Sequence, residues 1–306
     1  MRRWLSGALC ASLAVAGVLG LSGARTLADS PLPVSYSQSD ALRYALAHNN
    51  GAPPGANDWT CRPSRAHPRP VILVHGSLAN MAINWFTLSP LLVNAGYCVF
   101  ALNYGQQASH PVGYPGAVPA GATAAIPQSA KEFARFVARV RKATGAAKVD
   151  IVGHSQGGLM PRYYLAELGG GRYVHSLIGL APPNHGHTPE DDPQSQASAA
   201  ALSVLGGQAA RDEAAGSRFL AELNVHGDTV PGVKYTVIAS RDDTVVTPYT
   251  SAFLDGPEVQ NILLQDRCPK LTVSHGGLAY DRYTLGLVQR ALDPGVTAPQ
   301  CPSGDG

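Results

Sequence analysis

Charged residues are scarce in this 306-residue chain: Asp, Glu, Lys and Arg make up 14% of it, against 45% hydrophobic residues. The formal net charge is only +2, and no block of Lys or Arg follows the first residues. Nothing in the sequence therefore predicts a nucleic-acid partner. Internal repeats and low-complexity tracts are also lacking. The apolar content is enough for one sizeable core, so we expect a single domain that is monomeric.

Cysteine is infrequent too, with five residues in the chain. Cys10 lies in an apolar stretch that follows Arg2 and Arg3 and ends in small residues. This pattern predicts a cleavable secretory signal peptide over residues 1–28. A membrane anchor is the alternative, but the stretch is short for a bilayer span. The mature protein, residues 29–306, would then be extracellular.

Cleavage would leave four cysteines, and an even number in an exported chain predicts two disulfides in one of three pairings. We favour the sequential pairing, in which Cys61 joins Cys98 and Cys268 joins Cys301. Each bridge would close a loop of about 35 residues and contribute roughly 3 to 4 kcal/mol on the chain-entropy model.

Short apolar runs alternate with helical patterns along most of the chain. Strands buried on both faces and joined by helices are typical of an α/β protein with a mostly parallel sheet. A Pro-rich arm with one short helix precedes them, and residues 182–225 interrupt the alternation with two further helices, which we interpret as a cap. The predicted strands are 71–75, 97–104, 148–152, 174–181, 234–240 and 259–265; the predicted helices are 40–47, 83–95, 128–144, 156–168, 194–205, 211–223 and 280–292.

The segment Gly153-His154-Ser155-Gln156-Gly157 matches G-x-S-x-G. The motif alone is weak evidence, but here it follows a predicted strand and opens a predicted helix. This is the context of the nucleophile elbow of α/β hydrolases, where a strained turn exposes the serine hydroxyl. Glycines two residues to either side leave room for that turn. We therefore predict Ser155 as the nucleophile, against a plain helix cap as the alternative.

In this fold the acid and then the histidine follow the serine along the chain. His275 lies between the last predicted strand and the last predicted helix, which makes it the candidate base. Its partner should follow the preceding strand, where Asp242 and Asp243 stand together. A carboxylate there would fix the imidazole tautomer and stabilise the imidazolium. Position alone does not choose between the two acids.

Acyl transfer also needs donors aimed at the developing oxyanion, and two backbone N–H groups usually supply them. One should belong to Gln156, the residue after the nucleophile. The other should come from the loop that ends the first long strand, where Gly76 would let the backbone approach the substrate. Ser77 is the predicted second donor, and His75 is expected to be structural.

Eight segments of the chain together form a recognisable pattern: Val74–Ser77, Ala79–Met81, Asn84-Trp85, Gly96–Gly105, Gly153–Gly158, Pro183–Gly186, Asp243–Tyr249 and Ser274-His275. With these segments the chain resembles the secreted class 2 lipases of actinobacteria, and the resemblance spans roughly residues 55–293. It implies an α/β-hydrolase fold and hydrolysis of triacylglycerols and simpler esters. The family's acid stands one residue before a Val-Val-Thr-Pro-Tyr run, which implies Asp243 over Asp242. The resemblance to the family's cap is loose, so chain-length preference does not carry over.

The prediction is thus a secreted carboxylic-ester hydrolase that needs no cofactor or metal and acts on an ester or lipid substrate. A secreted acyltransferase would use the same triad, since only the acceptor differs. A non-catalytic binding protein on the same fold is the other alternative. The predicted cap is either a mobile lid with transient lipid contact or a fixed cover of the acyl pocket.

One further cluster, His185, His187 and the acids 190–192, could bind a metal. Acidic residues before a predicted helix at Gln194 are better explained as capping its N-terminus. Asn184 and His185 follow a strand end, and they either line the site or form a structural turn.

Overall fold

The computed structural model describes residues 1, 30–49, 51–106 and 121–302. The chain divides into two compact units, Met1–Pro31 and Leu32–Gly306, and the helices and strands of the described residues belong to the second. The predicted signal peptide, residues 1–28, lies outside the described residues except for Met1. Within those ranges no helix is both long enough and apolar enough to cross a membrane.

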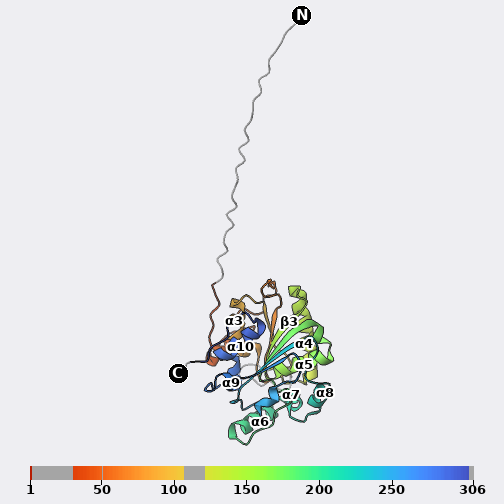
Figure 1. Cartoon of the computed structure of the whole chain (residues 1–306), viewed down its shortest axis with the longest axis vertical. Coiled ribbons are helices and arrows are strands. Elements are labelled where there is room, and N and C mark those ends of the chain that lie inside the picture. The colour runs from red at the N-terminus through yellow and green to blue at the C-terminus, as the bar shows by residue number, and fades with distance from the viewer. Residues whose placement is uncertain (2–29, 50, 107–120, 303–306) are drawn as a thin grey trace. The chain divides into compact units, whose positions relative to one another are not determined.

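A six-stranded, fully parallel sheet organises the second unit, in the order β2-β1-β3-β4-β5-β6 (Figure 1). Strands that follow one another along the chain are joined through helices. This confirms the predicted α/β class and the mostly parallel sheet. The strands are β1 (Val71–Val74), β2 (Val99–Leu102), β3 (Val149–His154), β4 (Val174–Leu180), β5 (Lys234–Ala239) and β6 (Val259–Leu263).

Side chains alternate between the two faces of the sheet, and each face is covered. Along β1, Ile72 and Val74 join one apolar cluster, while Val71 and Leu73 join the other. Helices α4 (Ile126–Thr144) and α5 (Gln156–Glu167) cover the first face; α3 (Leu88–Asn94) and α10 (Arg282–Leu292) cover the second (Figure 1). All four residues of β1 are fully buried, as a strand covered on both faces requires.

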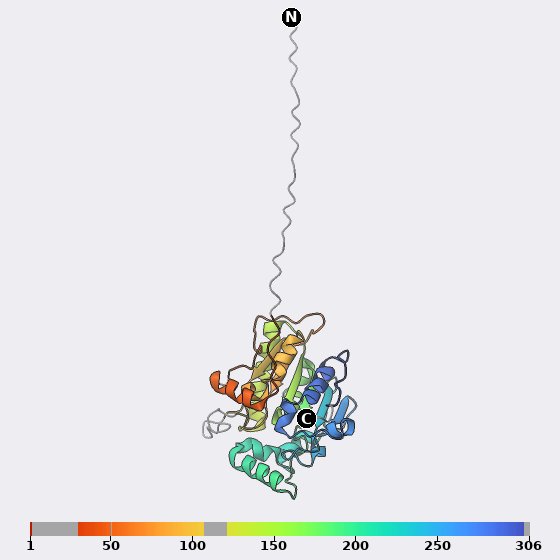
Figure 2. The same ribbon diagram turned by 90° about the vertical axis from the view of Figure 1, so that its left-hand side faces the viewer.

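Two predicted helices are each divided in the structure. The predicted helix 83–95 is α2 (Met81–Asn84) followed by α3, with a break at Trp85, and the break leaves Asn84 directed at the loop after β1. The predicted helix 211–223 is interrupted between Glu213 and Arg218, where Ala214 turns to an extended backbone with a ψ of 139° and Gly216 adopts a positive φ of 76°. The insertion therefore contains α6 (Pro193–Leu205), α7 (Gly207–Glu213) and α8 (Arg218–Asn224), which lie together at one end of the unit (Figure 2).

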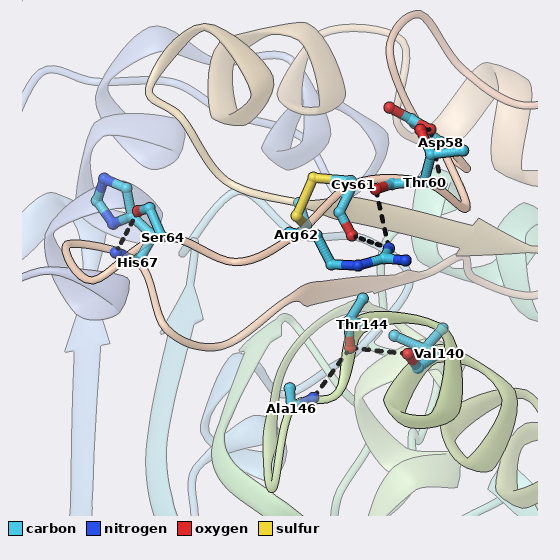
Figure 3. The surroundings of a disulfide bond; sticks show 10 residues. Asp58, Thr60, Cys61, Arg62, Ser64, His67, Val140, Thr144 and Ala146 are labelled. Carbon is cyan, nitrogen blue, oxygen red and sulfur yellow. Dashed lines mark hydrogen bonds between the residues drawn. A yellow bond between two sulfur atoms is a disulfide. The ribbon is translucent and has the colours of Figure 1, made fainter.

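Both cysteine pairs are joined as sequential disulfides. Cys61 is bonded to Cys98, the residue before β2, so the bridge ties the N-terminal arm to the sheet (Figure 3). Beside it, Arg62 donates to the carbonyl oxygens of Thr60 and Cys61. Cys268, directly after α9 (Leu264–Arg267), is bonded to Cys301 and holds the C-terminal segment. The arm itself contributes α1 (Gln38–Ala47).

Candidate active site

Ser155 occupies the sharp turn between β3 and α5. Its φ of 54° and ψ of −128° lie outside the regions that L-residues normally populate. Such a backbone costs free energy and persists only where the surrounding structure holds it. This strand-turn-helix geometry is that of a nucleophile elbow, and it presents the Ser155 side chain at the carboxyl edge of the sheet.

The two glycines of the motif are required by close backbone contacts. A Cβ on Gly153 would lie 1.9 Å from the carbonyl oxygen of Gly157. A Cβ on Gly157 would lie 2.0 Å from the carbonyl oxygen of Val74, at the end of β1. Both distances are shorter than any real contact, so a side chain at either position would force the elbow away from the sheet.

His275 and Asp243 form the hydrogen-bonded pair of the site. The Nδ1 atom of His275 lies 2.7 Å from Oδ2 of Asp243. The other carboxylate oxygen of Asp243 accepts from the backbone N–H groups of Val245 and Val246, at 2.8 and 2.9 Å. Burial alone would raise the pKa of Asp243, but His275 and these backbone donors lower it below its ordinary value. Asp243 is therefore held as a buried carboxylate against the imidazole.

The neighbouring acid, Asp242, serves a different contact. Its Oδ2 accepts from Nε2 of Gln265 at 2.9 Å and from the backbone N–H of Val273 at 3.3 Å. These bonds join the turn after β5 to the segment that leads to His275. Asp243 thus contacts the His275 imidazole, whereas Asp242 connects two loops.

The loop after β1 lies directly against Ser155. A Cβ on Gly76 would be 3.0 Å from the Cβ of Ser155, which shows how closely the backbone passes. The Gly76 N–H donates to Oδ1 of Asn84 at 3.0 Å, so α2 holds this loop in place. Ser77 follows, and the Nε2 of Gln156 donates to its hydroxyl oxygen at 2.9 Å. The two predicted oxyanion-hole residues are therefore neighbours at the elbow.

His154 connects Asn84, which holds this loop, to His275. Its Nδ1 lies 3.1 Å from Oδ1 of Asn84, and its Nε2 lies 3.0 Å from the carbonyl oxygen of His275. The His154 and His275 rings are 4.7 Å apart, centroid to centroid. Burial is the main cause that lowers the pKa of His154 to about 3. The motif marked His154 only as an unspecified position, so the sequence carried no signal for this link.

His75 is structural, as expected. Its Nδ1 lies 2.8 Å from the carbonyl oxygen of Gly76, and its ring stacks on Tyr104 at 4.6 Å. The Tyr104 hydroxyl donates to the carbonyl oxygen of His75. Burial lowers the pKa of His75 to about 4. The ring therefore supports the loop from below in its neutral form.

A cavity of about 440 Å³ opens onto Ser155 and His275. Its walls are largely apolar, and one of them comes from α1 of the N-terminal arm, which the sequence did not associate with the site. The described insertion residues are not among those that line it. The lining residues are Gln38, Ser39, Leu42, Gly76, Ser77, Leu78, Ala79, Ile83, Asn84, His154, Ser155, His275, Gly276, Ala279 and Tyr280.

The insertion reaches the site through a residue that the sequence did not single out, Glu213 at the end of α7. Oε1 of Glu213 accepts from the hydroxyl of Ser77 at 2.9 Å and from Nε2 of Gln156. Glu213 is only 2% exposed. An acid in an Ala- and Gly-rich segment gives no periodicity or motif that would locate it.

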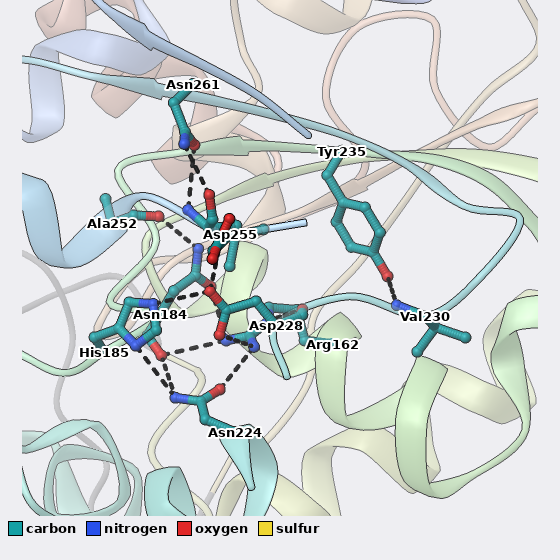
Figure 4. A network of polar contacts seen from close by, with 11 residues as sticks. Arg162, Asn184, His185, Asn224, Asp228, Val230, Tyr235, Ala252, Asp255 and Asn261 are labelled. Atoms are coloured by element: carbon teal, nitrogen blue, oxygen red, sulfur yellow. Dashed lines mark hydrogen bonds and ion pairs between the residues drawn. The ribbon is translucent and has the colours of Figure 1, made fainter. Parts of the chain in front are cut away.

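Asn184 and His185 belong instead to a structural network (Figure 4). His185 Nε2 lies 3.2 Å from Oδ2 of Asp228, and the buried Arg162 lies 3.6 Å from the other oxygen of that carboxylate. Asn184 donates to the carbonyl oxygen of Ala252. Neither Asn184 nor His185 appears among the described residues that line the cavity. Of the acids near them, Asp192 caps α6 by accepting from the first N–H groups of that helix, which is the capping role expected for these residues.

An elbow serine at the carboxyl edge of a parallel sheet, with a histidine–aspartate pair beside it, defines an α/β hydrolase. The chain belongs to the class 2 lipase family, whose model matches residues 68–276. It is similar to a triacylglycerol lipase of Burkholderia plantarii, with 29% identity over 57% of this chain and 39% of the relative. It is also similar to a triacylglycerol lipase of Pseudarthrobacter phenanthrenivorans, with 32% identity over 38% of this chain and 34% of the relative. The chain thus matches well under half the length of these curated relatives.

Solved structures support the fold. Aspergillus fumigatus lipase B matches with a TM-score of 0.60 and 18% identity, over 79% of this chain and 55% of that one. The mature form of Bacillus licheniformis lipase BlEst2 matches with a TM-score of 0.54 and 17% identity, over 79% of this chain and 99% of that one. At such low sequence identity, these structural similarities support only the α/β-hydrolase fold.

Proposed function

We propose that this protein is a serine carboxylic-ester hydrolase that works through Ser155, Asp243 and His275 and an acyl-enzyme intermediate. The observation that carries the proposal is that Ser155 and His275 line the same apolar cavity. Asp243 contacts the Nδ1 atom of the His275 imidazole. Membership of the class 2 lipase family supports the same chemistry.

In this mechanism the Ser155 hydroxyl attacks the ester carbonyl carbon while Nε2 of His275 takes its proton. Asp243, on Nδ1, keeps the imidazole in the tautomer whose Nε2 is free to accept, and it stabilises the imidazolium that forms. His275 then gives the proton to the leaving alcohol. A water molecule deprotonated by His275 then attacks the acyl carbon, and the bond to Ser155 breaks as His275 returns the proton to the serine oxygen, which releases the acid.

The tetrahedral intermediates need donors for their oxyanion, and we assign these to the backbone N–H groups of Ser77 and Gln156. The closeness of Gly76 to Ser155 and the anchoring of Gly76 on Asn84 support this assignment. Donors held rigidly before the reaction do not have to reorganise as charge develops. Loss of one such donor typically costs about 100-fold or more in rate.

The cavity fits an acyl chain better than a polar substrate. Its volume of about 440 Å³ is within the range of sites for small organic ligands. Leu42, Ile83 and Tyr280 contribute apolar surface to its wall. We therefore propose acyl esters, including acylglycerols, as the substrate class.

We also propose that the protein works outside the cytosol. Two disulfides support this, because such bonds persist in oxidising compartments. The N-terminal sequence, with its basic start and apolar stretch, supports export by cleavage near residue 28.

The decisive experiment is active-site labelling combined with substitution. A fluorescent organophosphonate should label the purified protein at Ser155, and Ser155→Ala should lose both the label and about a million-fold in turnover of a nitrophenyl ester. Far-UV circular dichroism of the variant should be unchanged, since the hydroxyl supports no packing. Labelling at another serine, or substantial turnover by Ser155→Ala, would overturn the proposal.

A further inference from the structure

Glu213 is a buried acid for which the proposed mechanism has no role. It ends α7, and its carboxyl lies beneath the elbow, in contact with both Ser77 and Gln156. Gln156 Nε2 in turn donates to the Ser77 hydroxyl and to the carbonyl oxygen of Ala122. One carboxyl thus contacts the side chains of both residues to which the oxyanion hole is assigned.

The adjacent acid shows that Glu213 is placed for more than attachment of the insertion. Asp212 accepts from the backbone N–H of Ile126 at 2.9 Å and so joins α7 to the start of α4. Asp212 is also bonded to Gln208 within its own helix. Mechanical attachment is therefore served by Asp212, whereas the carboxyl of Glu213 turns toward the catalytic loop.

Burial governs the charge state of Glu213. Desolvation raises its pKa to about 7, although the bonds from Gln156 and Ser77 and the nearby His275 act in the opposite direction. Asp212 adds a further upward contribution. Burial, together with the nearby Glu213, raises the pKa of Tyr104 well above its ordinary value, so Tyr104 is neutral near pH 7. Among the described residues, these are the titratable groups that act on Glu213.

We propose that Glu213 is a positioning residue, which holds Ser77 and Gln156 in place in its neutral form and suppresses ester turnover when it ionises. The proposal rests on the assignment of the oxyanion hole to these two residues. Under this proposal the insertion influences turnover through the side chain of Glu213. No helix has to move.

The reason is electrostatic. The transition state places a negative charge against the N–H groups of Ser77 and Gln156, and a carboxylate held by the side chains of the same two residues repels that charge. Because Glu213 is buried, solvent screens this repulsion only weakly. A neutral carboxylic acid in the same position accepts the same hydrogen bonds without that repulsion.

The test compares Glu213→Gln with the native protein across the pH range from 6 to 9, using a soluble short-chain ester and a pH-stat readout. Native turnover should fall about tenfold or more above neutral pH, while Glu213→Gln, whose amide oxygen still accepts from Ser77, should keep its activity there. Glu213→Ala should be impaired at every pH because it lacks the acceptor. Glu222→Gln, an acid-to-amide change on the exposed side of α8, serves as the matched control and should follow the native profile.

Infrared difference spectroscopy supplies a readout that does not depend on turnover. The native protein should show a protonated carboxyl band that disappears near pH 7 and is missing from Glu213→Gln. Parallel pH profiles for the native protein and Glu213→Gln, or a carboxyl that is already ionised at pH 6, would overturn the proposal. If the protein turned over no ester at any pH, the proposed function would fail, and the infrared titration would still decide the charge state of Glu213.

Discussion

The sheet and the insertion differ in what holds them in place. The strands are held by apolar packing on both faces, and the residues of β1 have no exposed surface. In the insertion, α6 buries only Ser195 and Leu202, while Val204 remains 71% exposed. The other two helices of the insertion are attached by both kinds of contact: Ala209, Leu220 and Leu223 are buried in the main apolar cluster, and Asp212 accepts from the backbone N–H of Ile126.

These two kinds of contact should respond differently to pH. Apolar packing makes the sheet rigid, so the elbow and the histidine–aspartate pair keep their geometry. Polar contacts depend on charge state, so a region held by them can respond to pH. The insertion meets the site through Glu213, and the comparison therefore predicts that changes at the sheet edge abolish activity, whereas changes in the insertion modulate it.

The largest effect should come from the paired acids after β5. Asp243→Asn should lower kcat by about 10,000-fold, because the amide favours the wrong imidazole tautomer. Asp242→Asn, with the same chemical change one residue away, loses only contacts to Gln265 and Val273 and should cost far less. Steady-state kinetics on a nitrophenyl ester measures both. Equal losses, or a greater loss for Asp242→Asn, would show that the acid is assigned to the wrong neighbour.

An intermediate effect is expected on stability at Glu213. Its pKa is raised from an ordinary value of 4.5 to about 7, so between these values the folded state binds more protons than the unfolded state. Stability from this group is therefore present at low pH and is lost as pH rises to 7. Between pH 5 and 8 the loss should be about 2 to 3 kcal/mol. Urea unfolding at both values, with disulfides intact, should show this difference in the native protein and a smaller one in Glu213→Gln.

The smallest effect is expected at a lipid surface. Leu220 and Leu223 of α8 are buried in the main apolar cluster and Glu213 is buried under the elbow, so α7 and α8 are fixed parts of the molecule. We expect the rate to saturate smoothly as tributyrin passes its solubility limit. A sharp increase at that limit would instead mean that the insertion moves as a lid, and Val204→Ser should then reduce the increase.

Much of the fold could be predicted because the relevant information is local. Apolar runs of strand length marked all six strands, and glycines around Ser155 marked the elbow. The helix breaks at Trp85 and at Ala214 were missed, because helical periodicity continues across each of them while the backbone turns. Position alone could not choose between Asp242 and Asp243, since adjacent carboxylates differ only in where the folded chain directs them.

The sequence by itself determined the parallel sheet, the elbow and the order of candidate residues along the chain. These features depend on residues close together in the sequence: apolar runs that form buried strands, and glycines that leave room for the elbow. Only the tertiary structure decided which groups meet. It placed α1 of the arm in the wall of the cavity, His154 between Asn84 and His275, and Glu213 in contact with Ser77. These contacts join segments far apart in the chain, and the charge of a buried acid depends on the surroundings that such contacts create.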